Sequence, residues 1–336
     1  MSTPIIETKQ LKKYFKTGKG LLHAVDGIDM RIEKGMTLGV VGESGCGKST
    51  LGRTILRLQE PTSGEIYFNG EDLLKYSKRQ MRKVRREMQI IFQDPYSSIN
   101  PRMSVSQLIA EPLIINHMCK SRADINSRVD ELMDTVGLAR RYAGSYPHEL
   151  DGGRRQRIGV ARALAVKPQF IVCDEPVSAL DVSIQAQILN LLMDLQEEFS
   201  LTYMFITHDL SVVKHISDEV AVMYLGMCVE RAKTDELFEN PLHPYTQALL
   251  SAIPVPSIDP REQEISVIKG ELKSPIDPEP GCRFAPRCPY ASAACSEKNI
   301  PLTQHGDGHY VACIRFSPLR SGGDNAGLTD KGRFDN

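Results

Sequence analysis

The run Gly42-Glu43-Ser44-Gly45-Cys46-Gly47-Lys48-Ser49-Thr50 is the most informative part of the sequence. It fits G-x-x-x-x-G-K-[ST], the pattern of a phosphate-binding loop (P-loop). The apolar run Leu38-Gly39-Val40-Val41 before it is predicted to be a buried strand, and residues 51–58 continue with a helical pattern. In such a loop, backbone amides and the helix N-terminus bind phosphates, Lys48 reaches the β- and γ-phosphates, and Ser49 holds Mg²⁺. The sequence therefore predicts an α/β fold built around a phosphate site.

A second apolar run ends in two acidic residues. Phe170-Ile171-Val172-Cys173 is predicted to be a buried strand, and Asp174 and Glu175 follow at its carboxyl end, where ligands bind in open α/β sheets. Phosphoryl transfer needs a carboxylate on the metal side and a group that positions the attacking water. We predict that Asp174 binds Mg²⁺ through water and that Glu175 polarises the nucleophilic water. The alternative is that the two acids only cap a helix.

Two more polar residues follow predicted strands. Gln93 comes directly after the buried run at residues 90–92, and we expect it to reach Mg²⁺ and the attacking water. His208 follows the strand predicted at residues 203–206. A lone histidine is usually structural, but this position beside the other strand ends makes a γ-phosphate contact credible. Tyr14 could stack on adenine, although the sequence alone favours a core or edge-strand aromatic there.

The bulk composition excludes several classes of protein. The chain has 336 residues, 41% of them hydrophobic and 25% charged, which is ordinary for a globular protein, and its net charge of −1 gives no nucleic-acid footprint. No apolar run approaches the roughly 18 residues of a membrane span, and the first ten residues lack a signal-peptide core. We therefore expect a cytosolic chain whose membrane role, if any, comes through a partner.

The pattern along the chain divides it into regions. Residues 5–37 are predicted to form short strands and turns, and a basic helix is expected within residues 71–88. Residues 94–167 carry chain breakers and then apolar residues at helical spacing, which indicates a helical insertion in the α/β core. Prolines crowd residues 241–280 in the pattern of a loop or extended arm, and residues 321–336 are expected to be disordered.

The order of these motifs resembles that of an ABC ATPase over about residues 5–235. The P-loop, Q-loop, signature, Walker B, D-loop and switch histidine of that family correspond to Gly42–Thr50, Gln93, Leu150–Arg157, Asp174-Glu175, Ser178–Asp181 and His208. The resemblance implies a RecA-like core with an antiparallel β subdomain at 1–93 and 168–240, and a helical signature subdomain at 94–167. It also makes Tyr14 the adenine-stacking aromatic and adds Ser178 and Asp181 as D-loop residues.

Three further segments resemble the oligopeptide/dipeptide importer branch of that family. They are Phe92–Arg102, His243–Leu250 and Cys282–Pro289, which extend the resemblance to about residue 318, within a C-terminal extension at 241–320. The resemblance implies a subunit that binds and hydrolyses ATP with Mg²⁺ at the cytoplasmic face of the membrane. Its partners would be a second ATPase subunit in head-to-tail contact, two permease subunits and an external binding protein. Peptide is the expected substrate, and nickel chelates, glutathione or sugars are alternatives.

The signature departs from the family pattern Leu-Ser-Gly-Gly-Gln. Asp151 stands in place of the serine and Arg154 in place of the glutamine, around Gly152 and Gly153. This departure affects the site that the signature would complete on the partner's P-loop, whereas this chain's own P-loop site keeps every expected residue. The family that this chain resembles usually has its second ATPase as a separate chain, which implies a heterodimer, and the altered signature predicts that the two ATP sites of the pair are asymmetric.

The extension contains four cysteines, Cys282, Cys288, Cys295 and Cys313. Four thiolates suit an iron–sulfur cluster or zinc, although their spacing matches neither the ferredoxin nor the common zinc-finger pattern. The resemblance favours a 4Fe–4S cluster, and four free thiols are the alternative. The other cysteines, Cys46, Cys119, Cys173 and Cys228, are expected to be ordinary core or loop residues.

Two other functions compete with the importer subunit. A soluble ABC ATPase of translation or DNA repair usually carries two cassettes or long coiled coils, and the sequence has neither. A regulatory cassette that binds ATP without hydrolysing it is disfavoured by Glu175 and His208.

Overall fold

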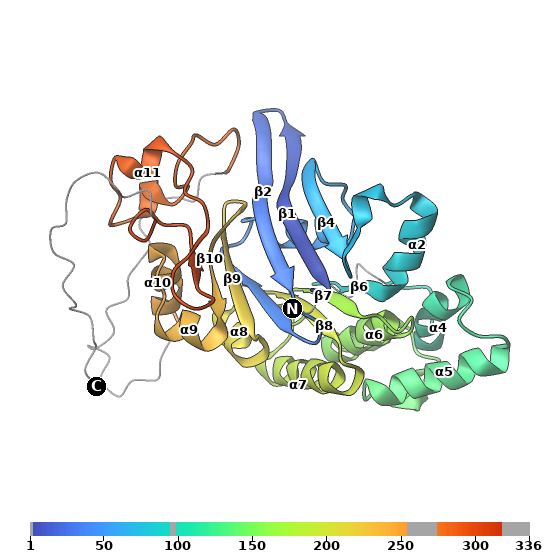
Figure 1. The fold of residues 1–336 in the computed structure, drawn as a ribbon. Helices are drawn as coiled ribbons and strands as arrows, with labels where there is room; N and C mark the ends of the chain where they lie inside the picture. The colour runs from blue at the N-terminus through green and yellow to red at the C-terminus, as the bar shows by residue number, and fades with distance from the viewer. Residues whose placement is uncertain (1–2, 95–98, 254–273, 318–336) are drawn as a thin grey trace, which may run out of the picture.

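The computed structural model describes residues 3–94, 99–253 and 274–317, which form two β-sheets and their covering helices (Figure 1). The strands are β1 (Ile6–Thr17), β2 (Gly20–Ile32), β3 (Thr37–Val41), β4 (Ser63–Phe68), β5 (Glu71–Asp72), β6 (Met88–Ile91), β7 (Phe170–Asp174), β8 (Thr202–Ile206), β9 (Glu219–Tyr224), β10 (Met227–Lys233), β11 (Thr303–Gln304) and β12 (Tyr310–Val311). Residues 321–336, which the sequence predicts to be disordered, lie outside the described ranges. Pro95–Ser98 of the importer-like segment also lie outside them.

Helices follow or separate most of these strands along the described residues. They are α1 (Lys48–Ile55), α2 (Lys78–Glu87), α4 (Val105–Ile115), α5 (Arg122–Thr135), α6 (Gly152–Leu164), α7 (Val182–Phe199), α8 (Leu210–Ile216), α9 (Thr234–Glu239), α10 (Pro244–Ser251) and α11 (Ala294–Glu297), with short 3₁₀ turns at Leu73–Lys75, Arg140–Tyr142, Pro147–Glu149 and Ala285–Arg287. In Figure 1, α4, α5 and α6 gather on one side of the sheets, while α10 and α11 lie on the opposite side.

The larger sheet has the strand order β11-β12-β10-β9-β3-β8-β7-β6. Strands β6, β7, β8, β3 and β9 are parallel, and β10, β12 and β11 add to them in antiparallel pairs. Every residue of β3, β7 and β8 is buried, as expected of parallel strands that helices cover on both faces. Because these strands are parallel, the residues that follow β3, β6, β7 and β8 meet at one end of the sheet.

The smaller sheet is antiparallel, with the order β2-β1-β4-β5. The prediction of short strands before the P-loop was wrong, since β1 and β2 have 12 and 13 residues. Three shifts in their register interrupt the regular alternation of the pair. Because these bulges interrupt the alternation of buried and exposed side chains, the sequence pattern indicates several short strands instead of two long ones.

The structure contains the inserted helical region. Apolar residues at helical spacing lie in α5, which begins with a capping box of Ser121 and Asp124, and Gly137 with φ of 65° follows its end. The sequence analysis missed α4, whose interior contains Pro112. A capping box of Ser104 and Gln107 starts that helix and could have revealed it.

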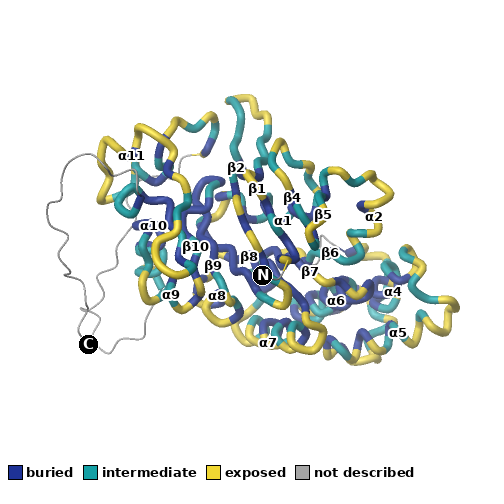
Figure 2. The backbone as a smooth tube through the Cα atoms, in the orientation of Figure 1, coloured by how far each residue is buried: buried dark blue, intermediate teal, exposed yellow. Residues whose placement is uncertain are grey.

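The core lies in the larger sheet and continues into the insertion. Figure 2 shows buried segments running through the central strands and into α6, whereas α2 and α7 carry long exposed stretches. In α2, Met81 is the buried residue, so the predicted solvated basic helix is confirmed. The mixed α/β fold with an inserted helical region is therefore as predicted.

The described residues after 240, at 241–253 and 274–317, pack on the core instead of forming a separate arm. His23 N–H donates to the Pro275 carbonyl at 2.9 Å, and Asp277 N–H donates to the Leu21 carbonyl at 2.9 Å, so this segment pairs with β2. Farther along, β12 pairs with β10 through Glu230↔Val311. The extension thereby adds strands to the sheet that carries the P-loop. The boundaries predicted for the four regions remain predictions.

Candidate active site

The P-loop joins β3 to α1, as the sequence predicts. Gly47 caps the helix with φ of 105°, and a Cβ there would lie 2.0 Å from the Ala24 carbonyl oxygen. Gly42 is equally constrained, because its Cβ would lie 2.1 Å from the Met223 carbonyl oxygen. Lys48 is 4% exposed, and its Nζ donates to the carbonyls of Gly42 at 2.7 Å and Glu43 at 3.1 Å. The loop is thus closely packed against the backbone of Ala24 and Met223, and its lysine bonds to carbonyls of the loop itself.

Ser49 and Asp174 meet beneath the loop. Ser49 Oγ donates to Asp174 Oδ1 at 2.6 Å, and Arg53 Nη2 donates to Asp174 Oδ2 at 3.1 Å. Asp174 is 1% exposed at the end of β7. A hydroxyl and a carboxylate are ligands that Mg²⁺ accepts, directly or through its waters, so the pair fits the predicted metal. The sequence analysis missed Arg53, although it lies one helical turn after Ser49.

Gln93, Glu175 and His208 converge from three separate strand ends. Gln93 Nε2 donates to Glu175 Oε2 at 2.9 Å, and His208 Nδ1 lies 3.3 Å from the same oxygen. Glu175 adopts a left-handed φ of 49°, and its N–H donates to the Ile206 carbonyl at 2.9 Å. Backbone strain of this kind is typical of functional positions. The predicted catalytic residues therefore face one another.

A cleft of about 520 Å³ collects these groups. Its lining comprises Phe15, Leu22, Ala24, Ser44, Gly45, Gly47, Lys48, Ser49, Thr50, Gln93, Glu175, His208 and Pro275. Cationic, hydroxyl, amide and carboxylate groups line the part built by the P-loop and the strand ends, and apolar side chains from the β1–β2 hairpin line another part. The cleft thus offers polar groups suited to phosphates beside an apolar surface suited to a flat ring.

The aromatic residue at the cleft is Phe15, not Tyr14. The Tyr14 ring instead stacks on His23, with centroids 3.9 Å apart, and its hydroxyl donates to Asp26. Burial and the Asp26 carboxylate raise the pKa of Tyr14. Neighbouring residues of a strand point to opposite faces, so the choice between two adjacent aromatics depends on the register of β1. The prediction of Tyr14 as the stacking residue is corrected on this geometry.

The signature residues lie at the start of α6. Asp151 accepts the Arg154 N–H at 2.8 Å and is the N-cap of the helix. A Cβ on Gly153 would lie 2.6 Å from Ile184 Cγ2, and one on Gly152 would lie 2.8 Å from Leu180 Cδ2. Within the described part of the chain, Asp151–Arg154 do not line the cleft at the P-loop.

The D-loop residues connect the catalytic glutamate to α7. Ser178 Oγ donates to the Glu175 carbonyl at 3.2 Å. Asp181 caps α7 by accepting the Ile184 N–H at 3.0 Å. The signature glycines therefore pack against the D-loop and the first turn of α7, and this contact couples their positions to that of Glu175.

The four tail cysteines give no support to the predicted metal centre. Among the residues that the structure describes, no group of three or more His, Cys, Asp or Glu side chains could hold a metal ion. Burial raises the pKa of the Cys282 thiol to about 11, and it also raises the pKa values of Cys288 and Cys313, which favours protonated thiols. Cys46, Cys173 and Cys228 are buried, as expected of core cysteines.

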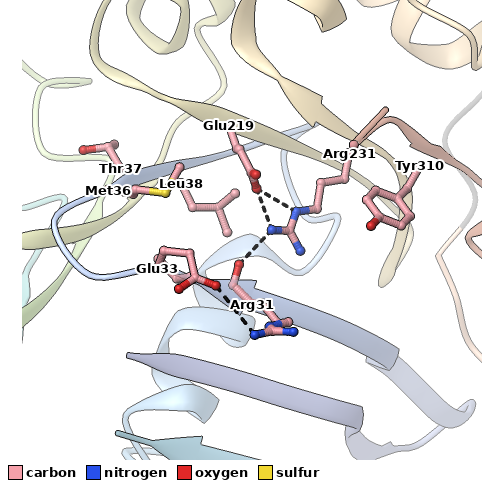
Figure 3. A pocket seen from close by; sticks show the side chains of 10 residues that line it. Arg31, Glu33, Met36, Thr37, Leu38, Glu219, Arg231 and Tyr310 are labelled. Atoms are coloured by element: carbon pink, nitrogen blue, oxygen red, sulfur yellow. Dashed lines mark hydrogen bonds and ion pairs between the residues drawn. The ribbon is translucent and has the colours of Figure 1, made fainter. Parts of the chain in front are cut away.

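Another cavity, of about 390 Å³, lies at the opposite end of β3 (Figure 3). Arg31, Glu33, Thr37, Glu219 and Arg231 are among its lining residues. The Arg231 guanidinium donates to Glu219 at 3.0 Å and to the Arg31 carbonyl at 2.8 Å, so it joins the two sheets. This cavity is separate from the P-loop, which follows the carboxyl end of β3.

Comparison with known proteins places this geometry in a family. Residues 25–178 match the family model described as ABC transporter, and residues 229–295 match the one described as oligopeptide/dipeptide transporter, C-terminal region. The oligopeptide transport ATP-binding protein AppF of Bacillus subtilis is 52% identical over 322 residues, covering 93% of this chain and 98% of that protein. The chain belongs to the ATP-binding subunits of ABC transporters.

Further comparisons agree with the assignment of this ABC subunit to its family. The dipeptide transport ATP-binding protein DppF of Haemophilus influenzae is 49% identical over 94% of this chain and 98% of that protein. Among solved structures, the dimeric ATP-binding cassette MJ0796 with ADP and Pi matches with a TM-score of 0.63 and 29% identity, over 68% of this chain and 98% of that one. The predicted family, fold class and ATPase activity are confirmed.

Proposed function

We propose that this ABC subunit binds MgATP in the cleft and hydrolyses it to power the import of peptides. The observation that carries the proposal is the convergence of Gln93, Glu175 and His208 opposite Lys48 and Ser49 in one cleft. A cation, a metal-binding hydroxyl and a water-positioning carboxylate in a single site are the groups that ATP hydrolysis requires.

Each residue has a role that follows from its place. Lys48 would exchange its bonds to loop carbonyls for bonds to the β- and γ-phosphates. Ser49 and Asp174 would hold Mg²⁺, which neutralises charge on the phosphate oxygens. Glu175 accepts a hydrogen bond from the attacking water and orients it, Gln93 fixes the Glu175 carboxylate, and His208 contacts the γ-phosphate.

The adenine ring would stack on Phe15. This phenyl ring lines the cleft, as do Leu22 and Ala24 of the same hairpin. Base–aromatic stacking contributes on the order of 1–3 kcal/mol per base and needs only an exposed ring face.

Peptide is the proposed substrate because residues 229–295 match the C-terminal model of oligopeptide/dipeptide transporters and because AppF and DppF are named for oligopeptide and dipeptide transport. Nickel chelates, glutathione and sugars remain alternative cargoes. A binding protein and permease, which this chain does not include, would select among them.

Partners are proposed from the exposed surfaces. We infer head-to-tail pairing with a second ATPase subunit, since Asp151–Arg154 are outside this chain's own cleft and MJ0796 is a dimer. A permease subunit would dock at a cavity of about 270 Å³ between β6 and α4, whose lining includes the exposed apolar Phe92 and Ile115. Within the described ranges no helix is long and apolar enough to cross a membrane. Attachment to the cytoplasmic face would therefore depend on the permease.

A 4Fe–4S cluster on Cys282, Cys288, Cys295 and Cys313 stays a separate proposal. It rests on the number of thiols in the extension and on the suitability of four thiolates as ligands of an iron–sulfur cluster. Metal analysis and the absorption spectrum of anaerobically purified protein test it. Iron near four atoms per chain supports the cluster, and protein with neither iron nor zinc contradicts it.

Co-purification with permease subunits, followed by ATPase assays of the assembled complex, tests the proposed function. Peptide-stimulated hydrolysis in that complex is the expected result. An ATPase that associates with no membrane subunit would favour the soluble alternative.

A further inference from the structure

The P-loop is bonded to two side chains from the region after residue 240. The Glu43 N–H donates to the Tyr245 hydroxyl oxygen at 2.8 Å. The Arg287 guanidinium forms two parallel bonds to the Glu43 carboxylate, at 2.7 Å and 2.9 Å. The second residue of the loop is therefore held through both its backbone and its side chain by groups more than 200 positions away in the sequence.

Both anchoring residues are themselves fixed. Tyr245 is completely buried, and its ring packs edge-on against Tyr224, with centroids 4.6 Å apart, and beside Phe284 at 5.4 Å. The Arg287 side chain is 8% exposed and also donates to the Tyr224 hydroxyl at 3.3 Å. Arg287 lies in a 3₁₀ turn that begins directly after Phe284. The anchors belong to one packed aromatic cluster and have little freedom to move.

The bond to Arg287 has two effects on the loop. First, two parallel bonds between planar groups fix the direction of the Glu43 side chain. The Glu43 carbonyl also accepts from Lys48 Nζ, so the conformation of this residue affects the place of the phosphate-binding lysine. Second, the Glu43 carboxylate adds a negative charge to a loop that must bind a polyanion, and the paired guanidinium neutralises it.

We propose that Arg287 is a positioning residue for ATP binding: it holds Glu43, and thereby the P-loop, in the conformation that accepts phosphates, and it cancels the Glu43 charge. The cysteine-containing extension is in this way a structural part of the nucleotide site. The inference rests on the proposed binding of MgATP at this loop.

The test is titration of MgATP into the purified full-length chain and its variants. Arg287→Met removes the guanidinium and leaves Glu43 charged, and we expect the Kd for MgATP to rise about tenfold, within the coupling range of contacting groups. Arg287→Lys keeps the charge without the two parallel bonds and should fall between wild type and Arg287→Met.

Rescue separates the loss of charge cancellation at Glu43 from a general loss of structure. In the Arg287→Met background, Glu43→Gln removes the uncompensated charge, so the double variant should bind MgATP more tightly than Arg287→Met alone. Arg283→Met is the matched control, because Arg283 also bonds from the extension to the core, at Asp26 and the Leu225 carbonyl, without touching the loop. Adding Glu43→Gln to Arg283→Met should give no rescue.

Wild-type affinity in Arg287→Met, or weakened binding that Glu43→Gln does not restore, would overturn the inference. The proposed function is judged separately by Lys48→Ala, which should abolish MgATP binding in an otherwise wild-type chain. If the wild-type chain binds no MgATP, the proposed function fails, and the inference about Arg287 fails with it.

Discussion

Asp151 and Arg154 form an ion pair at the start of α6. The Asp151 carboxylate accepts the Arg154 N–H at 2.8 Å and the Arg154 guanidinium at 2.7 Å. The Arg154 guanidinium also lies 4.8 Å from the centre of the Tyr142 ring. The two departures from the usual signature are thus bonded to each other, and the serine hydroxyl that would donate to a partner-bound γ-phosphate is replaced by a paired carboxylate.

The Asp151–Arg154 ion pair leads to a prediction about the rate of ATP turnover at the partner's site. An ionised carboxylate cannot donate a hydrogen bond, and Arg154 neutralises its charge only in part. We expect Asp151→Ser combined with Arg154→Gln to raise turnover at the partner's P-loop by about 10²-fold or more, since one donor to a developing anion changes turnover by about 10²–10³-fold. The assay is ATP hydrolysis by the proposed heterodimer, with Glu175 replaced by Gln so that only the partner's site turns over.

The corresponding control tests the asymmetry itself. Removing the catalytic glutamate of the partner's site should cost little activity in the otherwise native heterodimer, whereas Glu175→Gln should remove most of it. Equal losses from the two substitutions would show that the sites are equivalent.

A second prediction concerns the nucleobase. Phe15→Ala should weaken ATP binding by about tenfold or more, in line with the loss of one stacked aromatic. Tyr14→Ala removes a ring that stacks on His23 and does not line the cleft, so ATP affinity should fall less than in Phe15→Ala. Equilibrium titration of both variants with ATP is the measurement, and a larger effect at Tyr14 would reinstate that residue as the stacking group.

A third prediction concerns pH. His309 Nε2 lies 2.7 Å from the fully buried Glu230, and its Nδ1 lies 3.5 Å from Glu236. Burial alone lowers the pKa of His309, but the bonds to these two carboxylates outweigh it, so the folded pKa is raised. A raised folded pKa gives stability that is complete below about pH 6.5, the unfolded value, and is lost as the pH rises through the folded pKa.

His309→Gln keeps a hydrogen-bonding side chain but does not titrate. The melting temperature of the wild-type chain should therefore exceed that of His309→Gln by more near pH 6 than near pH 8.5, because the stability that the raised pKa gives is lost over that interval. Thermal denaturation at both pH values checks this. An unchanged pH dependence in His309→Gln would show that other groups cause it.

The sequence predicted the catalytic half of the site better than the rest. Lys48, Gln93, Glu175 and His208 could be assigned because each follows a parallel strand, and parallel strands deliver their carboxyl ends to one place. Phe15 could not be distinguished from Tyr14, because that choice depends on bulges in β1 which no local pattern reveals.

The contacts of the extension were invisible in the sequence for a different reason. The bond between Arg287 and Glu43 spans 244 positions, and neither residue has a local signal that names the other. The same holds for β12, a two-residue strand whose pairing with β10 depends on tertiary packing. By contrast, α4 has a readable capping box at Ser104, although Pro112 inside the helix is a contrary signal in the sequence.

The most direct test of ATP hydrolysis at this chain's own site is the ATPase activity of the assembled transporter with Glu175→Gln. The substitution keeps the size of the side chain and its contact with Gln93, but it removes the carboxylate that orients the water. We predict that MgATP binding is retained while turnover falls by about 10²–10⁴-fold, the range typical of lost acid–base or positioning groups. Hydrolysis near the wild-type rate would contradict the assignment of Glu175.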